Sequence, residues 1–261
     1  MDLHLSGKRV LITGGSAGIG LGIAKAFAAE GCHLVLVARS EAPLLRAAQE
    51  IESSFNTPVK VHACDVESDD TAPLLCDTFS QTDILINCAG SIPGGQLVDV
   101  SQKLWRESWE LKVFGFINMT RAFYQVMSHR RQGVILNVIG ASATGLDAKY
   151  IAGSTANAAL EGLTKSLGSA SPEHGVRVVG ISPGLVMTER LEKLLKARAR
   201  IDFGDASRWQ ELTANAPFGR TATVDEIAAS AVFLASSRSS YTSGAILNID
   251  GGFVHRHNWW G

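Results

Sequence analysis

Residues 9–20 read Arg-Val-Leu-Ile-Thr-Gly-Gly-Ser-Ala-Gly-Ile-Gly, and this stretch decides the fold. A short apolar run followed by glycines predicts a buried strand, a tight turn and a helix in close succession. Gly14 and Gly18 let the turn approach a pyrophosphate, and Gly20 lets the helix pack closely on the strand. The helix N-terminus attracts the anion. The stretch therefore predicts the first unit of a dinucleotide-binding sheet.

The rest of the chain repeats this alternation of short apolar runs and longer helical periods. Strands are expected at 8–13, 32–38, 59–64, 83–88, 133–139, 176–181 and 245–250. Helices are expected at about 18–30, 41–54, 69–80, 102–129, 151–170 and 223–236. Alternating strands and helices are typical of a parallel sheet with right-handed crossovers. We predict an α/β fold, a doubly wound Rossmann-type parallel seven-stranded sheet with helices on both faces.

Length and composition indicate one domain that binds neither nucleic acid nor membrane. The 261 residues are 46% hydrophobic and carry a net charge of −1, so no cationic field would hold a phosphate backbone or an anionic membrane. Four scattered cysteines indicate reduced thiols, and the pair His255 and His257 is too small a set for a metal site. We expect a cytoplasmic protein without a metal, a single dinucleotide-binding domain over residues 1–261.

The connection at about 184–222 is too long for a plain loop and is predicted to be a lid-like insertion over the ligand. Its helical part, 189–200, carries leucines at helical spacing and several cations. These cations form either a clamp for an acidic substrate or the solvated face of an amphipathic lid. The solvated face is the favoured interpretation.

Further motifs follow the glycine-rich loop in a fixed order along nearly the whole chain. They are Asp65-Val66, Asn87-Cys88-Ala89-Gly90, Ser182-Pro183-Gly184-Leu185-Val186-Met187-Thr188, Tyr241-Thr242-Ser243-Gly244 and Asp250-Gly251-Gly252. With the Thr-Gly-x-x-x-Gly-Ile-Gly loop, this series resembles the short-chain dehydrogenase/reductase family. The resemblance implies a nicotinamide cofactor, hydride transfer to or from a carbonyl or alcohol carbon, and a homodimer or homotetramer built from the helices at 102–129 and 151–170.

The resemblance also implies which residues hold the cofactor. They are Gly14, Ser16, Ala17, Gly18, Ile19, Gly20, Arg39, Ser40, Asp65, Val66, Asn87, Ala89, Gly90, Pro183, Gly184, Val186 and Thr188. Cys88 is interpreted as a small apolar filler.

The end of the second strand favours NADP(H) over NAD(H). An acidic residue there would accept hydrogen bonds from the ribose 2′-hydroxyl, but the strand ends in Arg39 and Ser40. Arg39 can pair with a 2′-phosphate and Ser40 can donate a hydroxyl. The alternative is that Arg39 is an ordinary solvated arginine.

The catalytic positions implied by the resemblance hold unexpected residues. The family uses a tyrosine as proton donor, a lysine four residues later, a serine thirteen residues before the tyrosine, and an asparagine on the preceding long helix. Those positions hold Gly153, Asn157, Gly140 and Lys112 respectively. Glycine cannot exchange a proton, so redox chemistry would need other groups.

The candidates near the crevice are Tyr150, Lys112 and Ser142. Tyr150 and Ser142 each have a structural alternative: Tyr150 as an aromatic at a helix entry, and Ser142 as a loop hydroxyl. Lys112 and Asn157 look like a reciprocal exchange that keeps a cation near the nicotinamide ribose, with independent drift as the alternative. We expect an NADP(H)-dependent oxidoreductase acting on a small carbonyl or alcohol through a non-standard proton-transfer site. The alternatives are a cofactor-binding pseudoenzyme or a non-redox enzyme such as a lyase or isomerase.

Overall fold

A computed structural model describes residues 1–256 as one α/β unit built on a seven-stranded parallel sheet. The spatial order is β3-β2-β1-β4-β5-β6-β7. The strands are β1 (Arg9–Thr13), β2 (His33–Ala38), β3 (Val59–Ala63), β4 (Ile84–Asn87), β5 (Gly133–Val138), β6 (Val176–Pro183) and β7 (Ile246–Ile249). The predicted fold class is confirmed, and β6 runs two residues beyond its predicted end.

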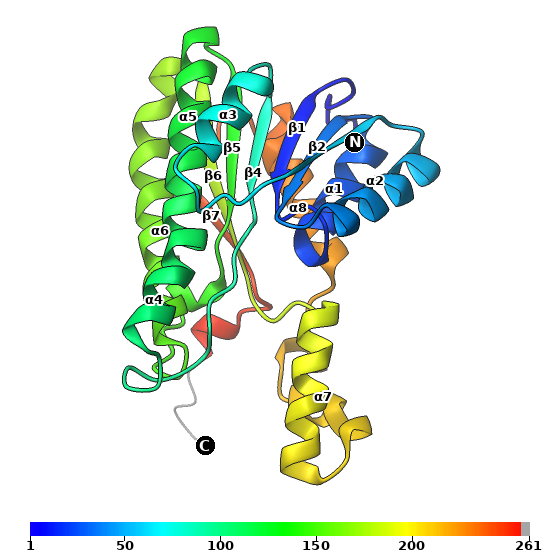
Figure 1. Cartoon of the computed structure of the whole chain (residues 1–261), viewed down its shortest axis with the longest axis vertical. Helices are drawn as coiled ribbons and strands as arrows, with labels where there is room; N and C mark the ends of the chain where they lie inside the picture. Colours follow the sequence, from blue (N-terminus) through cyan, green and yellow to red (C-terminus); the bar gives the residue numbers. More distant parts are fainter. Residues whose placement is uncertain (257–261) are drawn as a thin grey trace.

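Helices cover both faces of the sheet (Figure 1). One layer holds α1 (Gly18–Ala29), α2 (Glu41–Phe55) and α8 (Val224–Ala235). The other layer holds α3 (Thr71–Thr78), α4 (Gln102–Trp109), α5 (Gly115–Arg130) and α6 (Ile151–Ala170). The strands between these layers are almost wholly apolar, because a parallel sheet is buried on both faces.

The helix predicted at 102–129 is not one regular helix, which corrects that prediction. A π-helical turn at Glu110–Phe114 separates α4 from α5. A π turn inserts an extra residue into the helical ladder and is frequent at functional sites. Periodicity does not reveal it, because the inserted residue interrupts the apolar pattern at one point only, while the segments on either side keep their helical period.

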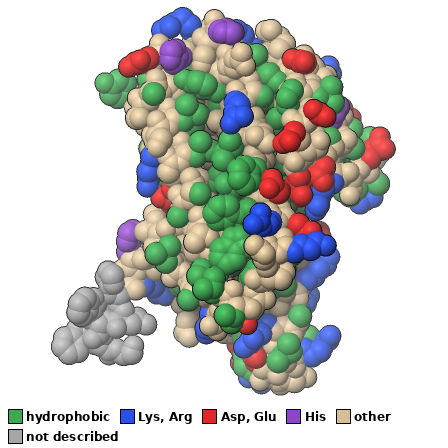
Figure 2. Space-filling model, turned by 60° about the vertical axis from the view of Figure 1, so that its left-hand side comes forward, with side chains coloured by type: hydrophobic (Ala, Val, Ile, Leu, Met, Phe, Trp, Pro, Cys, Tyr) green, Lys and Arg blue, Asp and Glu red, His purple; other side chains and the backbone are tan. Residues whose placement is uncertain are grey.

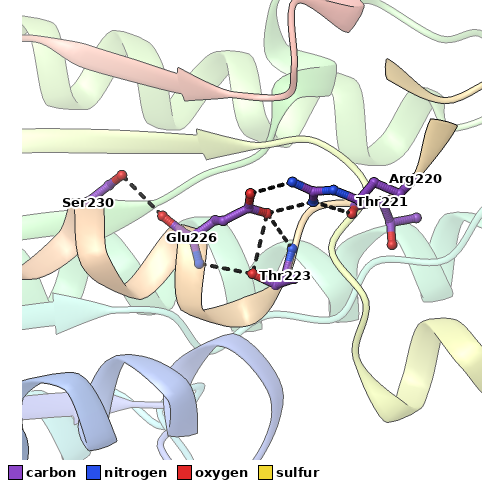
Figure 3. Close-up of polar contacts among 5 residues, drawn as sticks. All are labelled: Arg220, Thr221, Thr223, Glu226 and Ser230. Atoms are coloured by element: carbon purple, nitrogen blue, oxygen red, sulfur yellow. Dashed lines mark hydrogen bonds and ion pairs between the residues drawn. The ribbon is translucent and has the colours of Figure 1, made fainter. Parts of the chain in front are cut away.

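The segment predicted as a lid contains helix α7 (Glu189–Phe203) followed by short 3₁₀ turns. In Figure 1 α7 extends away from the carboxyl end of the sheet. The chain returns to the sheet at α8, whose first turn is held by a capping box between Thr223 and Glu226. Arg220 donates two hydrogen bonds to the Glu226 carboxylate at 2.9 and 2.7 Å, as Figure 3 shows. Hydrogen bonds from Arg220 lower the pKa of Glu226 to about 2.

This network fixes the start of α8, which lines the crevice at the carboxyl edge of the sheet. Val224, the residue after the cap, lies so close to α1 that a Cβ on Gly22 would come within 2.0 Å of its side chain. A larger residue than glycine at position 22 would therefore push α8 away from α1.

No helix among residues 1–256 is long and apolar enough to cross a membrane. Within the same residues, no three metal-binding side chains gather at one point. His257 and the Trp259-Trp260 pair, considered for a metal and for a subunit contact, lie outside the described residues.

Candidate active site

A crevice of about 1370 Å³ opens at the carboxyl ends of the strands. It lies where the strand order reverses, between β1 and β4. Open α/β sheets bind their ligands at this switch point. Its volume exceeds the roughly 300–1,000 Å³ typical of pockets for drug-sized ligands, so it has room for a dinucleotide and a small substrate.

The glycine-rich loop fits a dinucleotide because its glycines place no side chains where a pyrophosphate would approach the backbone. Gly14 has φ +71° and Gly18 has φ +56°, values that side-chain-bearing residues rarely adopt. A Cβ on Gly20 would lie 2.2 Å from the Gly14 carbonyl oxygen. The turn is therefore closed so tightly that only glycine is possible there, and the N-terminus of α1 points into the crevice.

Eleven of the residues predicted to bind the cofactor line this crevice. They are Gly14, Ser16, Ala17, Gly18, Ile19, Gly20, Ala89, Gly90, Pro183, Gly184 and Thr188. Cys88 also lines it, and burial raises the pKa of its thiol to about 12.

The other predicted cofactor residues do not line the crevice. They are Arg39, Ser40, Asp65, Val66, Asn87 and Val186. The side chain of Asn87 is fully buried and donates to Thr120 and Asn137, so it belongs to an internal polar network between β4 and β5.

Arg39 and Ser40 are exposed at the end of β2. The Arg39 guanidinium lies 3.9 Å from the Glu67 carboxylate, and the Arg39 side chain remains 62% exposed. An ion pair at this distance and exposure is weak. Arg39 is therefore available to a phosphate, with Glu67 as its competitor.

Lys112 places an amine inside the crevice. It lies in the π turn, lines the crevice, and donates from Nζ to the Ile139 carbonyl oxygen at 2.7 Å. Its chain packs against Gly90, where a Cβ would approach Lys112 Cδ to 2.9 Å. Burial, with a smaller contribution from Arg190, lowers the pKa of Lys112 to about 8. The amine therefore gains and loses its proton at a pH only slightly above neutral.

Gly140 and Asn157 form a complementary pair at the end of β5. Gly140 has φ +145°, and a Cβ on it would lie 2.8 Å from Asn157 Nδ2. Asn157 therefore fills the space that a residue-140 side chain would occupy. Its Nδ2 donates to Ser142 Oγ at 2.8 Å, while its buried Oδ1 accepts no hydrogen bond from residues 1–256.

Gly153 and Tyr150 form a second pair at the start of α6. A Cβ on Gly153 would lie 2.0 Å from Tyr150 Cε1 and 2.6 Å from the Tyr150 hydroxyl oxygen. The phenol ring therefore occupies the space of a residue-153 side chain. Tyr150 is half-buried and packs with Ile92 and Val113 in a small apolar cluster. Burial raises the pKa of its hydroxyl, and the nearby Arg190 lowers it in part.

The structure thus brings Lys112 into the crevice and joins Ser142 to Asn157, while Tyr150 lies beside the crevice in the space that Gly153 leaves open. Besides Lys112, the charged residues that line the crevice were not predicted individually as site residues; they are Lys25, Arg46, Glu50, Glu189, Arg190, Lys193 and Asp225. Arg190 and Lys193 were recognised only as part of a cationic helix. Their spacing does not separate them from the other cations, because Lys196 follows Lys193 at the same interval as Lys193 follows Arg190.

A model of the family described as "Enoyl-(Acyl carrier protein) reductase" matches residues 14–254. The chain is 35% identical over 253 residues to a galactitol 2-dehydrogenase (L-tagatose-forming) of Cereibacter sphaeroides, covering 96% of each chain. It is 31% identical over 254 residues to "Dehydrogenase/reductase SDR family member 6" of Rattus norvegicus, covering 96% of this chain and 98% of the relative.

A solved structure similar to this fold is L-sorbose reductase from Gluconobacter frateurii, complexed with NADPH and L-sorbose. The TM-score is 0.92 at 32% identity, covering 98% of this chain and 100% of that one.

Replacing Gly153 by alanine tests whether Tyr150 occupies the space beside Gly153. The new methyl group overlaps the phenol ring, so we expect Gly153→Ala to lower the free energy of unfolding by about 1–3 kcal/mol, measured by denaturant titration. In a Tyr150→Ala background the ring is gone, and the same change should stabilise α6.

Gly162→Ala in the same helix is the matched control, because nothing lies within 4 Å of its Cβ position. It should stabilise the helix by roughly 0.5–1 kcal/mol. If Gly153→Ala stabilised the protein as Gly162→Ala does, the placement of the Tyr150 ring would be wrong.

Proposed function

Because the chain belongs to the short-chain dehydrogenase/reductase family, we propose that it is an NADP(H)-dependent oxidoreductase that reduces a small carbonyl compound. The cofactor would be held by the glycine-rich loop and would supply the hydride. The chain's own residues bind it, orient the carbonyl and provide the proton.

One observation carries the proposal: an amine, Lys112, stands in the dinucleotide crevice. The family resemblance places glycines at the tyrosine and serine positions, so those positions cannot transfer a proton or orient an oxygen. We propose that Lys112 supplies the missing cation from the opposite helix. Its ammonium would donate to the ribose hydroxyls while remaining bonded to the Ile139 carbonyl.

Tyr150 is the proposed proton donor. Its ring lies where a side chain from Gly153 would begin, so a neighbouring residue delivers a phenol to the same region. Burial keeps the pKa of this phenol above its ordinary value, so it is protonated at neutral pH. A protonated phenol is suited to give its proton to the oxygen of a carbonyl under reduction, and less suited to take one from an alcohol. The cations Lys112 and Arg190 would then stabilise the phenolate until solvent reprotonates it.

Asn157 and Ser142 would position the ligand. Asn157 Oδ1 is a buried acceptor without a donor among residues 1–256, and such a group is costly unless a ligand or water satisfies it. A ribose hydroxyl can supply that donor. Ser142 accepts from Asn157 Nδ2, so its own hydroxyl hydrogen is free to point to a substrate oxygen.

A cofactor-binding protein without turnover is the second candidate. Gly140 and Gly153 favour it, because neither can take part in proton transfer. Oxidation of NADPH during incubation with a panel of ketones and aldehydes, followed by its absorbance, separates the two functions.

Lys112 and Tyr150 should have separable effects. Lys112→Ala should weaken NADPH binding about tenfold or more, the usual effect of losing a charge-assisted hydrogen bond, and abolish turnover. Tyr150→Phe should spare binding and reduce turnover alone. Since the pKa of Lys112 is about 8, the affinity of the native protein should fall as the pH rises through that value. Lys112→Ala should remove this pH dependence.

Lys103→Ala is the matched control for Lys112, because Lys103 lies on α4 with its side chain 84% exposed. It should change neither binding nor turnover. Unchanged NADPH affinity in Lys112→Ala would contradict the role of the ammonium.

Arg39 should decide the cofactor preference. We propose that Arg39 and Ser40 hold the 2′-phosphate, in keeping with the NADPH of the similar L-sorbose reductase. Arg39→Asp should reverse the preference toward NADH, by about ten- to a hundredfold in relative affinity. Glu67→Gln removes the competing carboxylate and should strengthen NADPH binding. Equal affinity of the native protein for the two cofactors would refute this assignment.

We propose a homodimer or homotetramer formed through α4, α5 and α6. Figure 2 turns this side of the molecule forward and shows hydrophobic side chains gathered in a band down the face. Leu104 and Phe114 of this region are 43% and 45% exposed. Contiguous apolar surface of this kind marks an interaction site.

Sedimentation at micromolar concentration should therefore give a dimer or tetramer, and Phe114→Glu should shift it toward the monomer. Lys103→Ala, on the same helical run, should leave the assembly unchanged. A monomeric native protein at that concentration would rule the proposal out.

A further inference from the structure

Two of the cations of α7 face the crevice, and two others pair within the helix. Arg190 and Lys193 line the crevice together with Leu194, which is the spacing of one helical face. Lys196 and Arg198 do not line it, and each pairs with a carboxylate of its own helix at 2.6 Å, Glu192 and Asp202 respectively. The two cations turned to the ligand space form no ion pair with a carboxylate of residues 1–256.

Arg190 lines the same crevice as Lys112. It is close enough to influence the pKa of both Lys112 and Tyr150, whereas Lys193 influences neither. Lys112 comes from the π turn before α5 and Arg190 from the first turn of α7, and both line the crevice. The region between them is where a small substrate must sit if the proposed reduction takes place.

Arg190 has an unused guanidinium. It is exposed, and no carboxylate among residues 1–256 comes within ion-pair distance of it. Glu189 and Asp225 also line the crevice, but neither forms a pair with Arg190. A guanidinium presents its donors as a planar fork that matches the two oxygens of a carboxylate.

We propose that the substrate of the reductase carries a carboxylate, which Arg190 binds as a bidentate pair while the substrate's carbonyl group lies toward Tyr150. This inference rests on the proposed function and names its substrate class. Lys193, one helical turn farther along, adds longer-range attraction.

A bound carboxylate would also change the protonation of Lys112. Arg190 lowers the pKa of Lys112 because two cations in one crevice repel each other. A carboxylate between them offsets that repulsion, so substrate binding would keep the Lys112 ammonium charged. A neutral carbonyl compound would leave the repulsion in place.

The competing occupant of Arg190 is a phosphate of the cofactor. The glycine-rich loop and the N-terminus of α1 already provide for the pyrophosphate from the other wall of the crevice. We therefore assign Arg190 to the substrate and treat cofactor binding as an outcome of the test.

The test compares an acid with its amide on the protein loaded with NADP⁺, which cannot reduce either compound. Calorimetry would measure the affinity of 4-oxopentanoate and acetoacetate against 4-oxopentanamide and acetoacetamide. The native protein should bind the acids about ten- to a hundredfold more tightly, as expected for a charge-assisted pair. Arg190→Ala should abolish this preference, and Arg190→Lys should restore part of it.

Lys193→Ala should reduce the preference by only about two- to threefold, because a solvated charge one turn away acts through screened attraction. Lys196→Ala is the control, because Lys196 pairs with Glu192 and does not line the crevice. It should leave the preference unchanged. These graded effects distinguish a contact with Arg190 from a general response to positive charge.

Two results would overturn the inference. One is equal or undetectable binding of acids and amides by the native protein. The other is a loss of NADP⁺ affinity in Arg190→Ala as large as the loss of acid affinity. The proposed function is tested separately: acid binding through Arg190 without NADPH oxidation refutes the reductase alone, and NADPH oxidation that shows no preference for oxo acids over neutral ketones refutes only the substrate class.

Discussion

The 2.7 Å hydrogen bond from Lys112 Nζ to the Ile139 carbonyl connects the two parts of the molecule on which the active-site account depends. Lys112 comes from the π turn between α4 and α5, and Ile139 directly follows β5. The bond holds a buried amine at the carboxyl edge of the sheet, beside Gly90. A buried amine is costly unless its environment compensates it, so the crevice is organised around this cation.

Besides the Lys112 cation, this region has two positions without a side chain. Gly140 and Gly153 carry no side chain, and in each case a neighbour occupies the space: Asn157 beside Gly140, and the Tyr150 ring beside Gly153. A side chain at position 140 or 153 would produce steric overlap in the present structure. The four positions therefore form a matched set, and a change at one requires a change at its neighbour.

Sequence reasoning predicted the sheet, its seven strands and the glycine-rich loop, because hydrophobic periodicity and the conformational needs of Gly14 and Gly18 are local properties. The π turn at Glu110–Phe114 was missed, since it depends on how the helix meets the sheet. The buried hydrogen bonds from the Asn87 amide to Thr120 and Asn137 were not predicted, since they depend on how β4, β5 and α5 pack together. Arg190 was grouped with solvated cations, because only the packing of α7 determines which of its faces meets the crevice.

The position of the Lys112 ammonium relative to bound cofactor tests the central claim most directly. A crystal structure of the protein with NADPH would show it. Our account predicts Lys112 Nζ within about 3.2 Å of a nicotinamide ribose hydroxyl, with Asn157 Oδ1 accepting from the other ribose hydroxyl. A structure in which Lys112 Nζ turns away from the ribose and Asn157 Oδ1 stays unpaired would contradict it.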